Sequence, residues 1–230
     1  MTTLPEPWLA RPAPPPAAAQ RRFEKLWARM LTQGPRQAAH YPLTEPKWQF
    51  LCYIAENADV VLHGSPDPTI DQFRPRRAYD TLEFGNRTAI YAATDGIWPM
   101  FYAVLDRERH PMSLSNACIR IGEPGAWSEP HYFFSITAAA LSQRPWRTGK
   151  VYLLPAHTFI AQPPLTVGDR LVQPAQAASE VPVRPLAKLT VTAQDFPFLD
   201  QVRGHDDKAL QERAAKDPGG FPWVTGPEQS

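Results

Sequence analysis

The apolar positions near the start of the chain follow the period of a helix. Five of them recur at spacings of three and four residues: Phe23, Leu26, Trp27, Met30 and Leu31. Such a stripe is typical of an amphipathic helix that packs one face on a core. Because Gly34 and Pro35 end the pattern, we expect this helix to begin at Ala17 and end at Gly34.

A second helix and a first strand are predicted next. Thr44 and Pro46 occupy positions typical of a cap and a first-turn proline, and the apolar residues that follow keep helical spacing to about Asn57. The run from Val60 to Leu62 is short and apolar, with two valines, and it is followed by a glycine and a serine. It predicts a buried strand that carries His63 at its end.

The remaining pattern predicts helices early and strands late. A strand is expected from Thr88 to Ala93, and Thr94 and Asp95 then cap an apolar helix from about Gly96 to Asp106. Short strands are expected further on, at 116–121, 150–154, 158–161, 170–172, 181–184 and 187–191, with one helix at about 135–142. This order favours an α+β fold with mostly antiparallel strands over repeated βαβ units.

Composition adds a tail at each end of that folded region. The chain of 230 residues has 27 prolines, and six of them fall within the first 20 residues. Proline-rich segments favour an extended conformation without internal hydrogen bonds, so we expect residues 1–16 to form a flexible tail. We expect helices packed on the core over 17–58, the main domain over 59–203, and an extension over 204–230 with a helix at about 208–215 and a loose end.

Charge and cysteine content exclude several classes of partner and site. The 24 basic and 23 acidic side chains leave a net charge of +1, so no global field favours nucleic acid or an anionic membrane. Cys52 and Cys118 stand far apart without the spacing of a metal site, and we expect both to be buried free thiols. No apolar stretch is long enough to span a membrane, and we expect a soluble protein in the cytoplasm.

The chain then shows an ordered series of short motifs. His63, Gly64 and Ser65 form the first motif, Phe84 and Gly85 the second, Ile90 to Asp95 the third, and Tyr102 follows on the expected helix. This series resembles the catalytic domain of the poly(ADP-ribose) polymerase branch of the ADP-ribosyltransferases. The resemblance implies two small, mostly antiparallel sheets around a cleft that binds NAD. It also implies transfer of ADP-ribose to an acceptor with release of nicotinamide.

The resemblance assigns a role to each candidate residue. His63 would hold the adenosine-side ribose, Gly64 would let backbone groups approach the nicotinamide amide closely, and Ser65 would also belong to the residues that bind NAD. Tyr91 and Tyr102 would stack on the two faces of the nicotinamide ring. Glu180 would correspond to the glutamate that opens a late strand in this family. A carboxylate there stabilises the positive charge that develops on the ribose, bonds a ribose hydroxyl or steers the acceptor.

Three positions depart from the family pattern. Pro99 stands where the family often has a serine that bonds the nicotinamide amide, so amide recognition would rest on backbone groups of Gly64. Ala89 replaces a glycine before the isoleucine and tyrosine, and Ala92 replaces a phenylalanine. The sequence also shows none of the regulatory and DNA-binding modules of the large polymerases, which favours a mono-ADP-ribosyltransferase. We expect NAD as a substrate and no metal ion.

Two other functions remain open from the sequence. The first is the related NAD-dependent RNA 2′-phosphotransferase chemistry, which needs basic side chains near His63; Arg74, Arg76 and Arg77 are candidates for that role. The second is a non-catalytic module that binds NAD or ADP-ribose in the same cleft. The acceptor remains unidentified in every case, and a protein, a nucleic acid and a small molecule are all consistent with the sequence.

Overall fold

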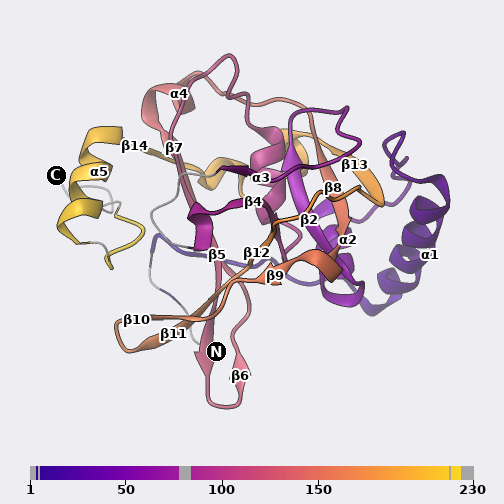
Figure 1. Cartoon of the computed structure of the whole chain (residues 1–230), viewed down its shortest axis with the longest axis horizontal. Coiled ribbons are helices and arrows are strands. Elements are labelled where there is room, and N and C mark those ends of the chain that lie inside the picture. Colours follow the sequence, from indigo (N-terminus) through magenta and orange to yellow (C-terminus); the bar gives the residue numbers. More distant parts are fainter. Residues whose placement is uncertain (1–3, 5, 78–83, 218, 224–230) are drawn as a thin grey trace.

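The chain folds into two β-sheets with helices packed around them (Figure 1). The computed structural model describes residues 4, 6–77, 84–217 and 219–223. Its α-helices in this part of the chain are α1 (Ala17–Gln33), α2 (Lys47–Asn57), α3 (Trp98–Val104), α4 (Ala138–Ser142) and α5 (Asp207–Lys216). Helices α1 and α5 lie at opposite ends of the longest axis of the molecule.

The first sheet has the strand order β1-β7-β5-β11-β10, with β14 beside β7 and β6 beside β5. Its strands are β1 (Leu9–Ala10), β5 (Leu114–Glu123), β6 (Ala126–Trp127), β7 (His131–Thr137), β10 (Leu165–Val167), β11 (Arg170–Pro174) and β14 (Arg203–His205). Every pair is antiparallel except β14 with β7.

The second sheet has the order β13-β8-β2-β4-β12-β9, with β3 beside β4, and all its pairs are antiparallel. Its strands are β2 (Val60–Ser65), β3 (Arg76–Arg77), β4 (Thr88–Ala93), β8 (Gly149–Pro155), β9 (Ile160–Ala161), β12 (Gln176–Ser179) and β13 (Ala187–Val191). Only Ala175 separates β11 of the first sheet from β12 of the second, and its N–H donates to the Cys118 carbonyl. The chain thus passes directly from one sheet to the other, and the described fold is α+β, as the sequence predicted.

Helix α3 packs against the face of the second sheet that carries Leu62 and Leu153, both fully buried. Two glycines make this close approach possible. A Cβ added to Gly64 would lie 1.7 Å from the Pro99 carbonyl oxygen, and one added to Gly149 would lie 1.8 Å from the Ala103 carbonyl oxygen. The helix backbone therefore lies directly on the strands.

Asp95 fixes the start of α3, as the sequence predicted. One carboxylate oxygen accepts the backbone N–H groups of Ile97 and Trp98, both at 2.8 Å, and the other accepts the Tyr132 hydroxyl at 2.7 Å. Pro99 occupies the first turn of the helix, where its missing N–H leaves no hydrogen bond unmade. Asp95 therefore has a structural role in helix capping.

The N-terminal segment differs from the flexible tail expected over 1–16. Leu9 and Ala10 pair with Tyr132 and His131 of β7, and the Trp8 ring lies 6.3 Å from the Phe133 ring. The Arg11 side chain forms an ion pair with Glu56, and its side chain is 8% exposed. Proline content alone did not reveal these contacts, because they are made to distant parts of the chain.

Two further expectations differ from the structure. The stretch 131–137 is strand β7 in the centre of the first sheet, and the helix expected at 135–142 begins only at Ala138. The strand expected at 181–184 does not form, and Val183 makes an isolated bridge with Phe73 instead. Pro182 and Pro185 lack an N–H for a strand ladder, whereas β12 forms just before them.

The remaining predicted elements agree closely with the structure. Helices α1, α2 and α5 and strands β2, β4, β8 and β13 occupy the expected positions within three residues at each end. Cys52 and Cys118 are buried free thiols, which confirms that prediction, and burial raises the pKa of both thiols. The main cluster of buried side chains joins α1, α2 and α3 to both sheets.

Candidate functional site

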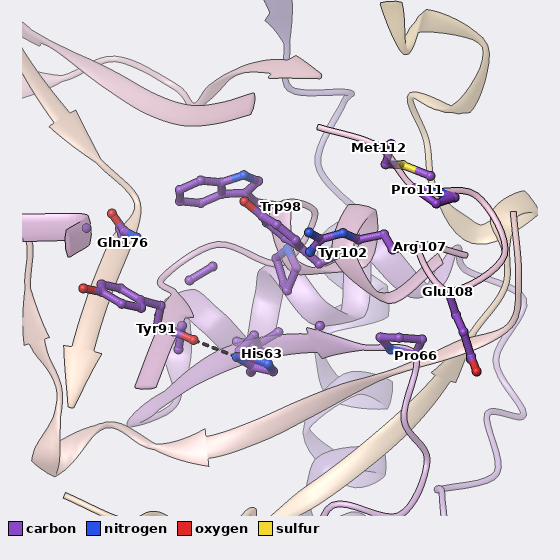
Figure 2. A pocket seen from close by; sticks show the side chains of 16 residues that line it. His63, Pro66, Tyr91, Trp98, Tyr102, Arg107, Glu108, Pro111, Met112 and Gln176 are labelled. Carbon is purple, nitrogen blue, oxygen red and sulfur yellow. Dashed lines mark hydrogen bonds between the residues drawn. The ribbon is translucent and has the colours of Figure 1, made fainter. Parts of the chain in front are cut away.

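A cavity of about 800 Å³ lies between the second sheet, α3 and the segment 107–112 (Figure 2). Four residues predicted from the sequence line it together: His63, Gly64, Tyr91 and Tyr102. They come from β2, β4 and α3. The fold thus brings His63 and Tyr102, which are 39 positions apart in the sequence, to the same cavity. Cavities of this size and concave shape are typical of small-molecule sites.

His63 lies where β2 and β4 separate. The two strands pair through Leu62 and Ala93, and beyond that pair the His63 ring lies between the strands, with Nδ1 2.7 Å from the Tyr91 carbonyl oxygen. Since a carbonyl oxygen only accepts, Nδ1 carries the proton and donates. In the neutral ring, Nε2 therefore has a lone pair that can accept a hydrogen bond.

The charge state of His63 follows from its burial. Burial lowers the pKa of His63, the Tyr91 carbonyl raises it, and nearby Arg76 lowers it further. The net shift is downward, so the ring is neutral at neutral pH. The ring centroid also lies 4.7 Å from that of Phe73, which holds the ring in place. His63 is thus suited to accept a hydroxyl hydrogen, as the ribose-binding role requires.

Gly64 and Ser65 make different contributions from one another. Gly64 lines the cavity, and the space that a side chain would occupy is filled by the Pro99 carbonyl, so the glycine is required by the packing of α3. Ser65 is 9% exposed, and its hydroxyl oxygen accepts the Asp67 N–H at 3.1 Å. Ser65 stabilises the turn after β2, and it does not line the cavity.

Tyr91 lines the cavity at its β4 edge. Its hydroxyl donates to the Phe84 carbonyl at 2.9 Å and accepts the Arg87 N–H at 2.8 Å, so the ring is tied to the segment before β4. In Figure 2 the ring of Tyr91 points away from that of Tyr102, toward Gln176. The structure places both tyrosines in one cavity, but it does not show them as two parallel faces of a sandwich.

Trp98 and Tyr102 form a second aromatic wall, of which the sequence predicted Tyr102 but not Trp98. They stand four residues apart on α3, and both line the cavity. The Oδ1 atom of Asn116 on β5 accepts the Trp98 indole N–H at 2.6 Å and the Tyr102 hydroxyl at 2.8 Å. One amide oxygen therefore fixes the orientation of two rings. In the sequence, the spacing of four residues between Trp98 and Tyr102 on a predicted helix could have indicated that the two rings share one face. Nothing in the sequence pointed to Asn116, because it lies on β5 of the first sheet.

Replacing Asn116 tests this arrangement. Asn116→Leu keeps a similar volume but leaves the indole N–H and the phenol without their acceptor, so we expect a loss of about 1–3 kcal/mol in the free energy of unfolding. Urea denaturation measures that loss. Asn116→Asp retains an acceptor oxygen and should lose less stability than the leucine variant. Equal stability of Asn116→Leu and the original chain would contradict the arrangement.

Like Ser65, Glu180 is a predicted site residue that the structure does not bring to the described lining of the cavity. Strand β12 ends at Ser179, and Glu180 follows in an exposed bend. Tyr91 pairs with Ala178, so Glu180 follows two residues beyond the position opposite Tyr91, roughly 7 Å along the chain at 3.3 Å per residue. The residue that opens this late strand is Gln176, which does line the cavity. A neutral amide, and not the Glu180 carboxylate, therefore lies at the start of β12.

The described part of the chain offers no cluster of three or more histidine, cysteine, aspartate or glutamate side chains for a metal ion. None of its helices has the length and apolar character needed to cross a membrane. In comparisons with known proteins, no family model, no curated protein and no solved structure matches the chain. Function must therefore be inferred from the cavity and the motif residues.

Proposed function

We propose that this chain is an NAD-dependent ADP-ribosyltransferase that binds NAD in the cavity and transfers ADP-ribose to an acceptor. The observation that carries the proposal is the convergence of His63, Gly64, Tyr91 and Tyr102 on one cavity of about 800 Å³. These residues were selected from their order in the sequence alone. Their meeting in space supports the resemblance to the ADP-ribosyltransferases, and the volume suits a dinucleotide.

The contacts of the cavity fit the parts of NAD. The neutral His63 ring presents Nε2 as an acceptor for a ribose hydroxyl. Tyr91, Trp98 and Tyr102 supply flat faces for a base, and an aromatic pair contributes about 0.5–1.5 kcal/mol beyond the area that it buries. Pro99 offers no hydroxyl at the cavity wall, so the backbone of Gly64 is the proposed partner of the nicotinamide amide.

We assign Glu180 to the acceptor side of the reaction. Cleavage of the bond between nicotinamide and ribose develops positive charge on the sugar, and the acceptor must then approach that carbon. Glu180 is exposed and follows the strand that pairs with the Tyr91 strand, outside the described lining of the cavity. Of the three roles considered from the sequence, steering the acceptor fits this position better than stabilising the charge on the ribose or bonding a ribose hydroxyl of bound NAD.

The proposal is tested by incubating the full chain with NAD labelled in its adenosine part, together with a mixture of proteins and nucleic acids. A transferase releases nicotinamide and leaves the label on an acceptor. Release without labelled acceptor would indicate NAD hydrolysis, and no release would contradict the transferase.

A second candidate is a module that binds NAD or ADP-ribose without cleaving it. The observation that favours it is the neutral Gln176 at the opening of β12, together with the position of Glu180 outside the cavity lining. Calorimetry separates the two candidates, because the module binds NAD and ADP-ribose tightly and releases no nicotinamide. Detectable nicotinamide release by the original chain excludes this second candidate.

A further inference from the structure

The charged side chains of the cavity lie at the end formed by the segment 107–112. Among the described lining residues, Arg107 and Glu108 are the two that carry a full charge at neutral pH. The rest of the lining is apolar, aromatic or neutral, including the amide of Gln176 and the ring of His63. A ligand that fills this cavity therefore meets its formal charges at one end.

Arg107 and Glu108 differ in their pairing. The Glu108 carboxylate lies 3.7 Å from the Arg147 guanidinium, so its charge is partly balanced within the protein. The neighbouring Arg109 lies 3.9 Å from the Asp106 carboxylate. Arg107 has no ion pair with any residue in the described ranges. It is thus a cation available to a ligand, and in Figure 2 its side chain extends toward Tyr102.

Asp106 holds the base of this segment in place. It is 7% exposed, its N–H donates to the Pro145 carbonyl at 2.9 Å, and its own carbonyl accepts the His110 N–H at 3.0 Å. Its carboxylate lies 3.6 Å from the Arg147 guanidinium. The backbone N–H of Arg147 donates to the Val104 carbonyl at 2.8 Å. The residue that follows Asp106 therefore starts from a fixed backbone position beside the cavity.

We propose that Arg107 binds the diphosphate of the nucleotide in this cavity. The inference rests on the proposed NAD-binding function and adds a residue that the sequence motifs do not contain. A guanidinium presents a planar fork of N–H donors that matches two phosphate oxygens, and it keeps its charge at every physiological pH. With aromatic rings at Trp98 and Tyr102 and a cation at Arg107, the cavity combines surfaces for a flat base and for an anion, which is the composition of a nucleotide.

The test compares ligands that differ in phosphate. The full chain, Arg107→Gln and the matched control Arg109→Gln are titrated by calorimetry with ADP-ribose, with nicotinamide riboside and with inorganic pyrophosphate. Arg109 belongs to the same segment, is 83% exposed and does not line the cavity. We expect Arg107→Gln to weaken ADP-ribose binding about tenfold or more, since hydrogen bonds to charged groups contribute roughly 1.5–3 kcal/mol. Binding of nicotinamide riboside should change less than twofold, and Arg109→Gln should match the original chain.

The outcomes separate this inference from the proposed function. Arg107 does not bind the diphosphate if Arg107→Gln binds ADP-ribose as tightly as the original chain. The same conclusion follows if Arg107→Gln loses affinity for ADP-ribose and for nicotinamide riboside by the same factor. Pyrophosphate binding that depends on Arg107, in a chain that binds neither ADP-ribose nor nicotinamide riboside, supports the anion site and contradicts the proposed NAD function. A chain that binds none of the three ligands overturns both.

Discussion

Gly64→Ala is expected to destabilise the fold by about 3 kcal/mol or more, or to prevent folding altogether. The new Cβ would lie 1.7 Å from the Pro99 carbonyl oxygen and 2.7 Å from its carbonyl carbon. Both are backbone atoms, so no side-chain rotation relieves the overlap. Overpacking of a well-packed core typically costs 1–3 kcal/mol, and here the whole of α3 must move. Urea denaturation followed by circular dichroism measures the loss.

The matched control for this prediction is Gly219→Ala, because among the described residues a Cβ there meets only the Asp217 side chain, at 3.8 Å. It should unfold at the same urea concentration as the original chain. A folded Gly64→Ala variant should also bind NAD more weakly, since α3 carries Trp98 and Tyr102. Stability of Gly64→Ala within 0.5 kcal/mol of the original chain, roughly the range of a surface substitution, would show that α3 does not pack on β2 as described.

Glu180→Gln is expected to separate binding from transfer. Because Glu180 lies in an exposed bend outside the described cavity lining, the dissociation constant for NAD should change less than twofold. Transfer of ADP-ribose should fall roughly 100-fold or more, because even a small misplacement of an attacking group can cost about that factor in rate. Calorimetry measures the first quantity, and labelling of the acceptor with saturating NAD measures the second.

Glu212→Gln is a suitable control for that experiment, because Glu212 is an exposed glutamate on α5 with a side chain 68% exposed. It should match the original chain in both measurements. Transfer by Glu180→Gln at the original rate would remove Glu180 from the mechanism. A large loss of NAD affinity in this variant would instead place Glu180 in the NAD site and contradict its assignment to the acceptor side.

The elements around the site could be predicted where the local pattern was strong. The apolar run that leads to His63, the β4 run and the cap at Asp95 are each encoded within a few neighbouring residues, and each lies where the sequence predicted. β12 was missed because the small and polar residues of Gln176–Ser179 have low strand propensity. That strand forms because its backbone pairs with β4 and β9.

The residues that line the cavity could be predicted less well, because contacts between distant segments of the chain determine them. Asn116 is 18 residues from Trp98 in sequence and lies in the other sheet, so no local spacing connects the two. Glu180 was chosen because it precedes an apolar alternation, yet Pro182 and Pro185 prevent the strand expected there. Arg107 enters the cavity through the segment that Asp106 anchors, and charge content alone gave no indication of that position.

The most direct test of the account is a calorimetric titration of the full chain with NAD, repeated with His63→Leu. We expect one NAD bound per chain, and an affinity at least tenfold lower in His63→Leu, because the acceptor at Nε2 and the bond to the Tyr91 carbonyl are both lost. Urea denaturation of His63→Leu, run in parallel, confirms that the variant is folded. No binding of NAD to the original chain, or equal affinity in a folded His63→Leu variant, would contradict the central claim that this cavity is an NAD site.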